Sequence, residues 1–137
     1  MRFMMLMYPQ IDESRYSEGP SAEDVEAMMK YNRELSEAGA LLALDGLHGG
    51  AEGARVTFAS NGHASVTDGP FTEAKEMVGG YWMIEVRSKE EAVEWAKRIP
   101  ARACMVELRR VHEREDFPAE VQAVLDEHPS FAEHAGG

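Results

Sequence analysis

The stretch Gly79-Gly80-Tyr81-Trp82-Met83-Ile84-Glu85-Val86 is the strongest strand pattern in the chain, and a helix start follows it at Ser88-Lys89-Glu90-Glu91. Ser88 and Glu91 are three residues apart, the spacing at which a serine and a glutamate form a capping box. The residues that follow give this helix a wide apolar face: Ala92, Val93, Trp95, Ala96 and Ile99. Pro100 then ends the helix, because proline cannot continue one. The stretch therefore predicts a strand followed by an amphipathic helix.

The first part of the chain repeats this order. The run from Arg2 to Tyr8 is apolar and bounded by Pro9, which is typical of a strand covered on both faces. Residues 10–20 are polar and have no period, so they predict a loop. Ser21 is a helix cap and Gly39 a stop signal. Between them the apolar stripe consists of Val25, Met28, Met29, Leu35 and Ala38. Residues 40–47 predict the second strand.

Two further features complete the order of elements. Residues 55–59 and 64–67 flank Asn61-Gly62, a strong signal for a β-hairpin. Residues 104–111 alternate as a final strand does, and Pro118 starts a last helix. The predicted class is therefore α+β: a ferredoxin-like βαββαβ domain with an inserted β-hairpin and an extra C-terminal helix. We assign residues 1–112 to the domain and residues 113–137 to a helical extension with a frayed tail.

Composition narrows the classes of partner. The chain has 137 residues, enough for one domain with a single core. Its net charge of −11, from 25 acidic and 14 basic residues, repels phosphate backbones and anionic membranes, so we expect no nucleic-acid or membrane partner. No run approaches the roughly 20 apolar residues of a membrane span. The single cysteine, Cys104, fits a reducing compartment, and we expect a cytoplasmic protein.

Alternation along two strands predicts which sheet face is left open. Trp82, Ile84 and Val86 suit the helix side, which places Tyr81, Met83 and Glu85 on the opposite side. The last strand behaves in the same way, with Cys104, Val106 and Leu108 inward and Met105, Glu107 and Arg109 opposite. Two helices cover only one face of a sheet. We therefore expect a homodimer that packs sheet on sheet and encloses a small cavity.

The segment from Asp68 to Glu76 is the densest cluster of polar, turn-forming residues, and we expect it at a sheet edge. Asp68 is a candidate catalytic carboxylate, and the alternative is that its side chain supports the Gly69-Pro70 turn. Glu73, Lys75 and Glu76 are candidate ligand-binding residues, with Lys75 holding an anionic substrate. The alternative for these three is a solvated, salt-bridged loop.

Other candidate residues follow the strands. His48 and Asp45 form a candidate acid–base pair, but they meet only if the chain bends at Gly46. Tyr81, on the sheet face that the helices leave uncovered, is a candidate ligand-binding residue. Glu107 and Arg109 share that face and suit either an ion pair at the dimer interface or a clamp for an anion. No histidines have metal-ligand spacing, so we predict neither a metal nor a cofactor.

The residues Asp68-Gly69-Pro70-Phe71, followed by Glu73, Lys75 and Glu76, resemble the "DGPFAETKE" motif of the DGPF branch of the YCII-related superfamily. Supporting matches are the opening residues 1–6, the Gly79-Gly80-Tyr81 step and residues 107–109, and the likeness covers residues 1–111. The resemblance implies a dimeric α+β barrel with a cleft between subunits. It also implies an uncharacterised function, in some members linked to extracytoplasmic-function sigma factors.

Other branches of that superfamily carry a histidine–aspartate pair for acid–base work, including dehydrochlorinase-like enzymes. This chain has no histidine between Met1 and Leu47, and Ala74 stands where the motif usually has threonine. We therefore expect a homodimer that binds a small polar or anionic molecule, with acid–base chemistry of the isomerase or lyase type as its enzymatic form. The alternative is a non-enzymatic regulatory module that docks on a sigma factor.

Overall fold

Four strands form a central antiparallel sheet, in the order β2 (Leu41–Gly46), β5 (Gly80–Glu85), β1 (Arg2–Pro9) and β6 (Cys104–Arg110). The structure is a computed structural model, and it describes residues 1–71 and 76–129. The two central strands, β5 and β1, pair directly, with Met5 opposite Trp82. This α+β arrangement is compatible with the predicted ferredoxin-like fold.

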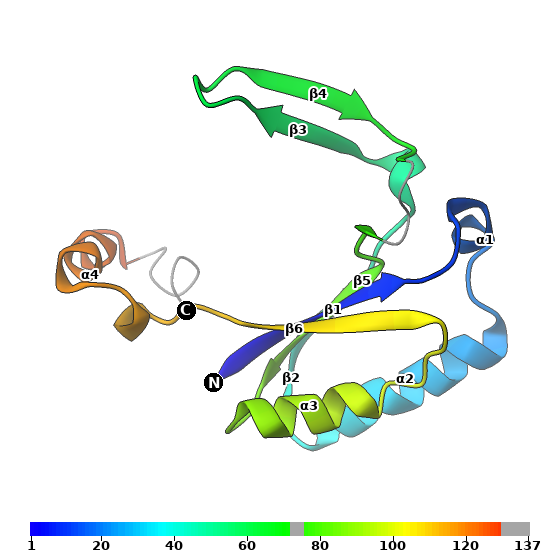
Figure 1. The fold of residues 1–137 in the computed structure, drawn as a ribbon. Coiled ribbons are helices and arrows are strands. Elements are labelled where there is room, and N and C mark those ends of the chain that lie inside the picture. Colours follow the sequence, from blue (N-terminus) through cyan, green and yellow to red (C-terminus); the bar gives the residue numbers. More distant parts are fainter. Residues whose placement is uncertain (72–75, 130–137) are drawn as a thin grey trace.

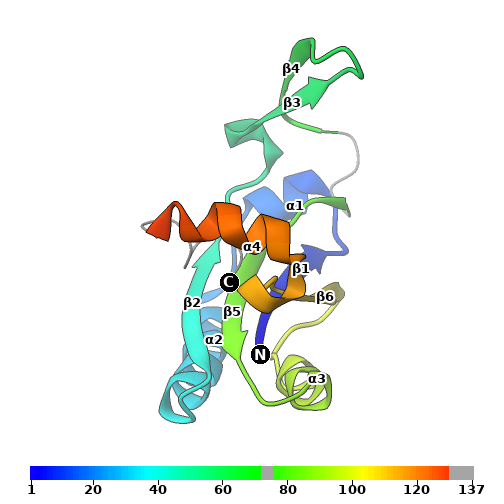
Figure 2. The same cartoon turned by 90° about the vertical axis from the view of Figure 1, so that its left-hand side faces the viewer.

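Helices α2 (Ala22–Glu37) and α3 (Lys89–Lys97) lie on the same face of the sheet, below it in Figures 1 and 2. The predicted caps are present, since Ser21 Oγ accepts from the Asp24 N–H and Ser88 Oγ from the Glu91 N–H, both at 3.1 Å. Gly39 ends α2 with a φ of +73°, a conformation that favours glycine. The core between helices and sheet consists of Phe3, Met5, Tyr31, Leu35, Ala40, Trp82, Ile84, Val86, Ala92 and Ile99.

The predicted apolar stripe of α2 is wrong in part. Leu35 is buried and Met28 packs against the core, but Val25 and Met29 are exposed. The helix instead buries Tyr31 and Asn32. Their polar atoms find partners inside the core: Tyr31 Oη donates to the Trp95 carbonyl at 2.7 Å, and Trp82 Nε1 donates to Asn32 Oδ1 at 2.8 Å. Because these polar atoms have hydrogen-bond partners, Tyr31 and Asn32 can be buried. A stripe predicted from apolar residues alone therefore misses them.

The loop predicted over residues 10–20 contains a short helix, α1 (Glu13–Ser17). Asp12 caps it, because its Oδ1 accepts from the Arg15 N–H at 2.9 Å and from Ser14 Oγ at 2.7 Å. These hydrogen bonds lower the pKa of the Asp12 carboxyl below its ordinary value. Tyr16 Oη donates to the carbonyl oxygens of Leu47 and Gly79. The helix therefore fastens the end of β2 to the start of β5.

The predicted hairpin is confirmed, and it stands apart from the central sheet. Strands β3 (Ala54–Phe58) and β4 (Ala64–Asp68) pair only with each other, as a separate two-stranded sheet that follows the short 3-10 helix η1 (Gly50–Glu52). Figures 1 and 2 show this hairpin on the side of the sheet away from α2 and α3. We call residues 54–68 the hairpin arm.

The C-terminal extension also projects from the sheet. After β6 come the 3-10 helix η3 (Arg114–Asp116) and helix α4 (Ala119–Asp126), and α4 buries none of its residues. Arg114 donates to both carboxylate oxygens of Asp126, at 2.9 and 2.6 Å, and so ties α4 to η3. The predicted frayed tail lies outside the described residues. No helix in the described part of the chain is long and apolar enough to cross a membrane.

Candidate functional site

The sheet face opposite α2 and α3 carries four of the nine candidate residues, Asp45, Tyr81, Glu107 and Arg109. We call it the open face, and it consists of Arg2, Met4, Leu6, Tyr8, Ala43, Asp45, Tyr81, Met83, Glu85, Met105, Glu107 and Arg109. Burial along β5 alternates as predicted: Trp82 and Ile84 are buried in the core, whereas Tyr81 and Met83 are half-buried. On β6, Met105 is 46% exposed and Val106 packs against the core. The predicted sides of both strands are therefore confirmed.

Four residues face one another in a row across the open face. Asp45 on β2 lies opposite Tyr81 on β5, Tyr81 lies opposite Leu6 on β1, and Leu6 lies opposite Glu107 on β6. Tyr81 Oη donates a hydrogen bond to Asp45 Oδ2 at 2.8 Å. This hydrogen bond, and then the negative charge of Asp45, raise the pKa of the Tyr81 phenol above its ordinary value. Tyr81 is therefore held as a neutral hydroxyl that donates to a carboxylate.

The opposite edge of the same face carries an ion pair. Arg109 lies 3.5 Å from Glu107 on the same strand, and the two side chains are 70% and 41% exposed. An exposed pair of this kind contributes little stability. Two strand spacings separate Tyr81 from Glu107, which corresponds to about 10 Å. Between them lies an apolar floor formed by Met4, Leu6 and Met83.

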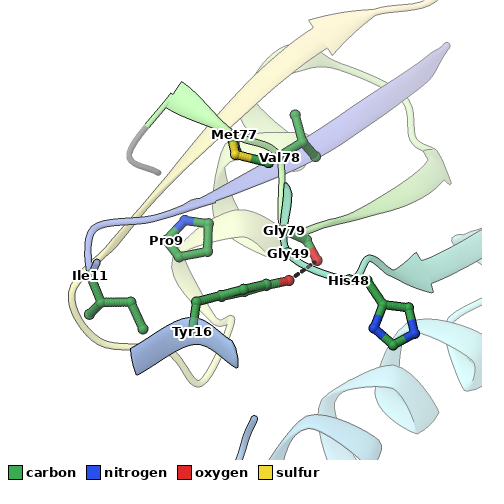
Figure 3. Close-up of a pocket in the computed structure, with 8 residues that line it drawn as sticks. All are labelled: Pro9, Ile11, Tyr16, His48, Gly49, Met77, Val78 and Gly79. Carbon is green, nitrogen blue, oxygen red and sulfur yellow. Dashed lines mark hydrogen bonds between the residues drawn. The ribbon is translucent and has the colours of Figure 1, made fainter. Parts of the chain in front are cut away.

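His48 lies away from the open face, at a shallow pocket beyond the end of β2 (Figure 3). The pocket is lined by Pro9, Ile11, Tyr16, His48, Gly49, Met77, Val78 and Gly79, and its cavity volume is about 10 Å³. That volume holds about one water molecule. The imidazole points away from the Tyr16 hydroxyl (Figure 3), and within the described residues it has no hydrogen-bond partner. Asp45, the predicted partner of His48, pairs with Tyr81 instead.

Asp68 is the last residue of β4, so it lies at the base of the hairpin arm and not at an edge of the central sheet. Its carboxylate is exposed and makes no hydrogen bond within residues 1–71 and 76–129. Packing contributes to the turn after it. A Cβ on Gly69 would lie 1.6 Å from the Gly50 carbonyl oxygen, and the Gly69 N–H donates to the Gly53 carbonyl at 3.1 Å. Glycine at position 69 therefore allows the arm base to close on η1.

Only part of the segment from Pro70 to Glu76 lies within the described residues. Phe71 packs against Gly50, where an added Cβ would lie 2.8 Å from the Phe71 ring, and the Arg55 guanidinium lies 4.0 Å from the centre of that ring. This contact is a cation–π interaction that fixes the arm base. Glu76 is exposed. The predictions for Glu73 and Lys75 fall on residues outside the described ranges.

The structure thus brings Asp45, Tyr81, Glu107 and Arg109 onto one face and places Asp68 and His48 elsewhere. Sequence reasoning missed the floor of this face, Met4 and Leu6, because the apolar run of β1 gave no reason to separate its two sides. The even positions of β1 pair with Tyr81 and Met83, so the known alternation of β5 would have identified them.

A family model of the YCII-related domain matches residues 1–115 of the chain. The match includes the central sheet, helices α2 and α3 and the hairpin arm, whereas α4 lies beyond it. No curated protein matches the chain closely enough to count as a relative. Since the matched residues make up most of the sequence, the chain belongs to the YCII-related domain family.

Proposed function

We propose that this protein is of the DGPF type and acts as a homodimer that binds a small polar or anionic molecule between the open faces of its two copies. One observation carries the proposal. The open face combines an apolar floor with a hydroxyl–carboxylate pair, Tyr81 and Asp45, and an exposed cation, Arg109. Small-molecule sites are usually apolar cavities with a few polar groups in their walls, and two stacked open faces would create such a cavity.

The composition of β1 supports the dimer. Its core side carries Phe3 and Met5, and its open side carries Met4 and Leu6. A strand that is apolar on both sides is typical of a sheet covered on both faces. In the single chain the helices cover one face only (Figure 1). A second copy, packed through the same surface about a two-fold axis, covers the other face and encloses the polar groups at its edges.

The polar groups suit proton transfer within an anionic ligand. Arg109 lies three strand spacings from Asp45, about 14 Å, so its charge attracts the anionic ligand to the face but does not hold it at Asp45. The Asp45 carboxylate takes a proton from the ligand, and the same proton returns at a neighbouring atom, so an isomerisation balances without a co-reactant. Tyr81 donates to this carboxylate through Oδ2, which orients its other oxygen, Oδ1, for the ligand. Acid–base work of this kind depends on a group within hydrogen-bond reach of the proton that moves.

Two measurements test the proposal. Sedimentation equilibrium of the full chain is expected to give a dimer, and a monomer at all concentrations would contradict it. A thermal-shift screen with small carboxylates and phosphates is expected to find ligands that raise Tm. Their effect should fall in Tyr81→Phe and Arg109→Ala. The matched control is Arg102→Ala, which removes a cation outside the open face. Ligand binding that is indifferent to the first two changes would exclude this site.

A second candidate function is that of a regulatory module that docks on a sigma factor through α4. The observation in its favour is that α4 leaves Val121 and Val124 exposed and lies beyond the family match. This function needs the apolar side of α4 to stay accessible in the assembled protein. Cross-linking of a cysteine at position 124 of α4 to a second copy of the chain tests that requirement directly.

A further inference from the structure

The hairpin arm has one apolar and one polar face. Val56 lies directly opposite Val66, and Phe58 lies opposite Ala64. Side chains alternate along a strand, so these residues share one face with Ala54. The other face carries Arg55, Thr57, Ser65 and Thr67. This alternation is typical of a sheet with one buried face, and no element within residues 1–71 and 76–129 of a single copy buries it.

All ten residues of β3 and β4 are exposed, the apolar ones included. Val56 is 52%, Phe58 69% and Val66 67% exposed. A two-stranded ribbon alone is at best marginally stable in water, and packing against another element makes it stable. The apolar face of the arm therefore needs a covering surface that a single copy does not provide.

Helix α4 also has apolar side chains that nothing in the described residues covers. It exposes Val121 and Val124 on one helical side, three residues apart, and none of its residues is fully buried. The arm and α4 lie at opposite ends of the sheet: the arm follows the end of β2 at Gly46, and α4 follows the end of β6 at Arg110. Figure 1 shows this separation, with both elements away from α2 and α3.

We propose that the apolar face of the hairpin arm docks on α4 of a second copy of this chain. The inference rests on the proposed dimer and adds its geometry. When two sheets stack through their open faces about a two-fold axis that runs across the strands, the arm end of each sheet lies over the α4 end of the other. Each copy then covers the arm of its partner and has its own arm covered.

Charge favours this surface over the rest of the molecule. The chain has a net charge of −11, so two copies repel each other. Between Ala54 and Thr67, Arg55 is the one residue among aspartate, glutamate, lysine and arginine. It lies on the polar face, against the Phe71 ring. The apolar face carries no charge before Asp68 at its base, so docking there desolvates no ion.

Paired cysteines test the contact in the full-length chain. In a Cys104→Ser background, the combination of Val66→Cys with Val124→Cys is expected to give a covalent dimer with a short bis-maleimide. The combination of Ser65→Cys with Val124→Cys is the matched control, because Ser65 lies next to Val66 on the polar face, and it is expected to cross-link several-fold less. Equal cross-linking of the two pairs, or a dimer linked by Val66→Cys alone, would overturn the docking on α4.

Sedimentation equilibrium separates this inference from the proposed dimer. Phe58→Lys is expected to weaken dimerisation about tenfold or more, as for an apolar residue at an interface centre, whereas its neighbour Thr57→Lys on the polar face leaves it unchanged. Neither residue contributes to the core, so both variants fold. If Phe58→Lys does not weaken the dimer and cysteines at positions 66 and 124 do not cross-link, the arm contact is excluded but the dimer itself is not. Helix α4 is then available to another partner. A monomeric unmodified chain overturns both proposals.

Discussion

The Trp82 indole N–H donates a 2.8 Å hydrogen bond to Asn32 Oδ1, and both residues are buried. This bond joins α2 to the central strand β5. Aromatic contacts extend the connection, since the Tyr31 ring meets the Trp82 ring edge-on at 5.9 Å and the Trp95 ring at 6.3 Å between centroids. The layer of helices is thus held to the sheet by one polar pair inside an aromatic cluster, in addition to aliphatic packing.

Replacing the acceptor of this pair tests its contribution to stability. Asn32→Leu keeps a similar volume and leaves the indole N–H without a partner, so we expect a loss of about 1–3 kcal/mol in the free energy of unfolding. Urea denaturation measures it. In the double variant with Trp82→Phe the unsatisfied N–H is absent, so the two losses should be less than additive. Strict additivity would show that the hydrogen bond contributes nothing specific.

Alkaline pH should destabilise the protein through Tyr31. Burial, the largest cause, raises the pKa of the Tyr31 phenol well above its ordinary value. A group with a raised pKa in the folded state contributes its full stability below its unfolded pKa, here about 10, and loses it as the pH rises further. Urea midpoints should therefore fall steadily above pH 10. In Tyr31→Phe the fall should be shallower, although the variant starts lower because it lacks the hydrogen bond to Trp95.

Much of the fold is readable from local signals. At each of these signals one residue, or one pair, sets the local backbone conformation. They are the serines at the two helix starts, Gly39 after α2 and Asn61-Gly62 in the hairpin. The side of each residue on β5 and β6 follows from alternation alone. By contrast, α1 is only five residues long and is stabilised by Tyr16 bonding to distant carbonyl groups. Contacts between residues far apart in sequence leave no local pattern.

The candidate site was only partly predictable for the same reason. Asp45, Tyr81, Glu107 and Arg109 were singled out one strand at a time, and the sheet register brings them onto one face. The pairing of Asp45 with Tyr81 depends on β2 lying beside β5, which adjacency in sequence does not give. Asp68 is a candidate because the motif Asp68-Gly69-Pro70-Phe71 is distinctive. The close approach of Gly69 to Gly50 explains part of that motif by packing.

Gly69→Ala should disrupt the arm base. The added methyl group would lie 1.6 Å from the Gly50 carbonyl oxygen, so the backbone must move, and we expect a loss of about 1–3 kcal/mol. Gly46→Ala is the matched control, because a Cβ at that position meets nothing within 4 Å. Limited proteolysis should cut residues 54–71 faster in Gly69→Ala than in Gly46→Ala. Equal cutting rates would mean that the Gly69 contact does not fix the arm.

The phenol of Tyr81 should report on its carboxylate partner. Its pKa is raised first by the hydrogen bond to Asp45 and then by the charge of Asp45, so Asp45→Asn should lower it. An amide removes the negative charge and can donate to the phenolate, which a carboxylate cannot do. Titration of ¹³C-labelled tyrosine rings by NMR resolves the change. Tyr31 is the internal control, since burial is the main cause of its raised pKa and Asp45→Asn leaves that burial intact. A Tyr81 pKa that is the same with Asp45 and with asparagine at that position would contradict the pairing and, with it, the placement of proton transfer on the open face.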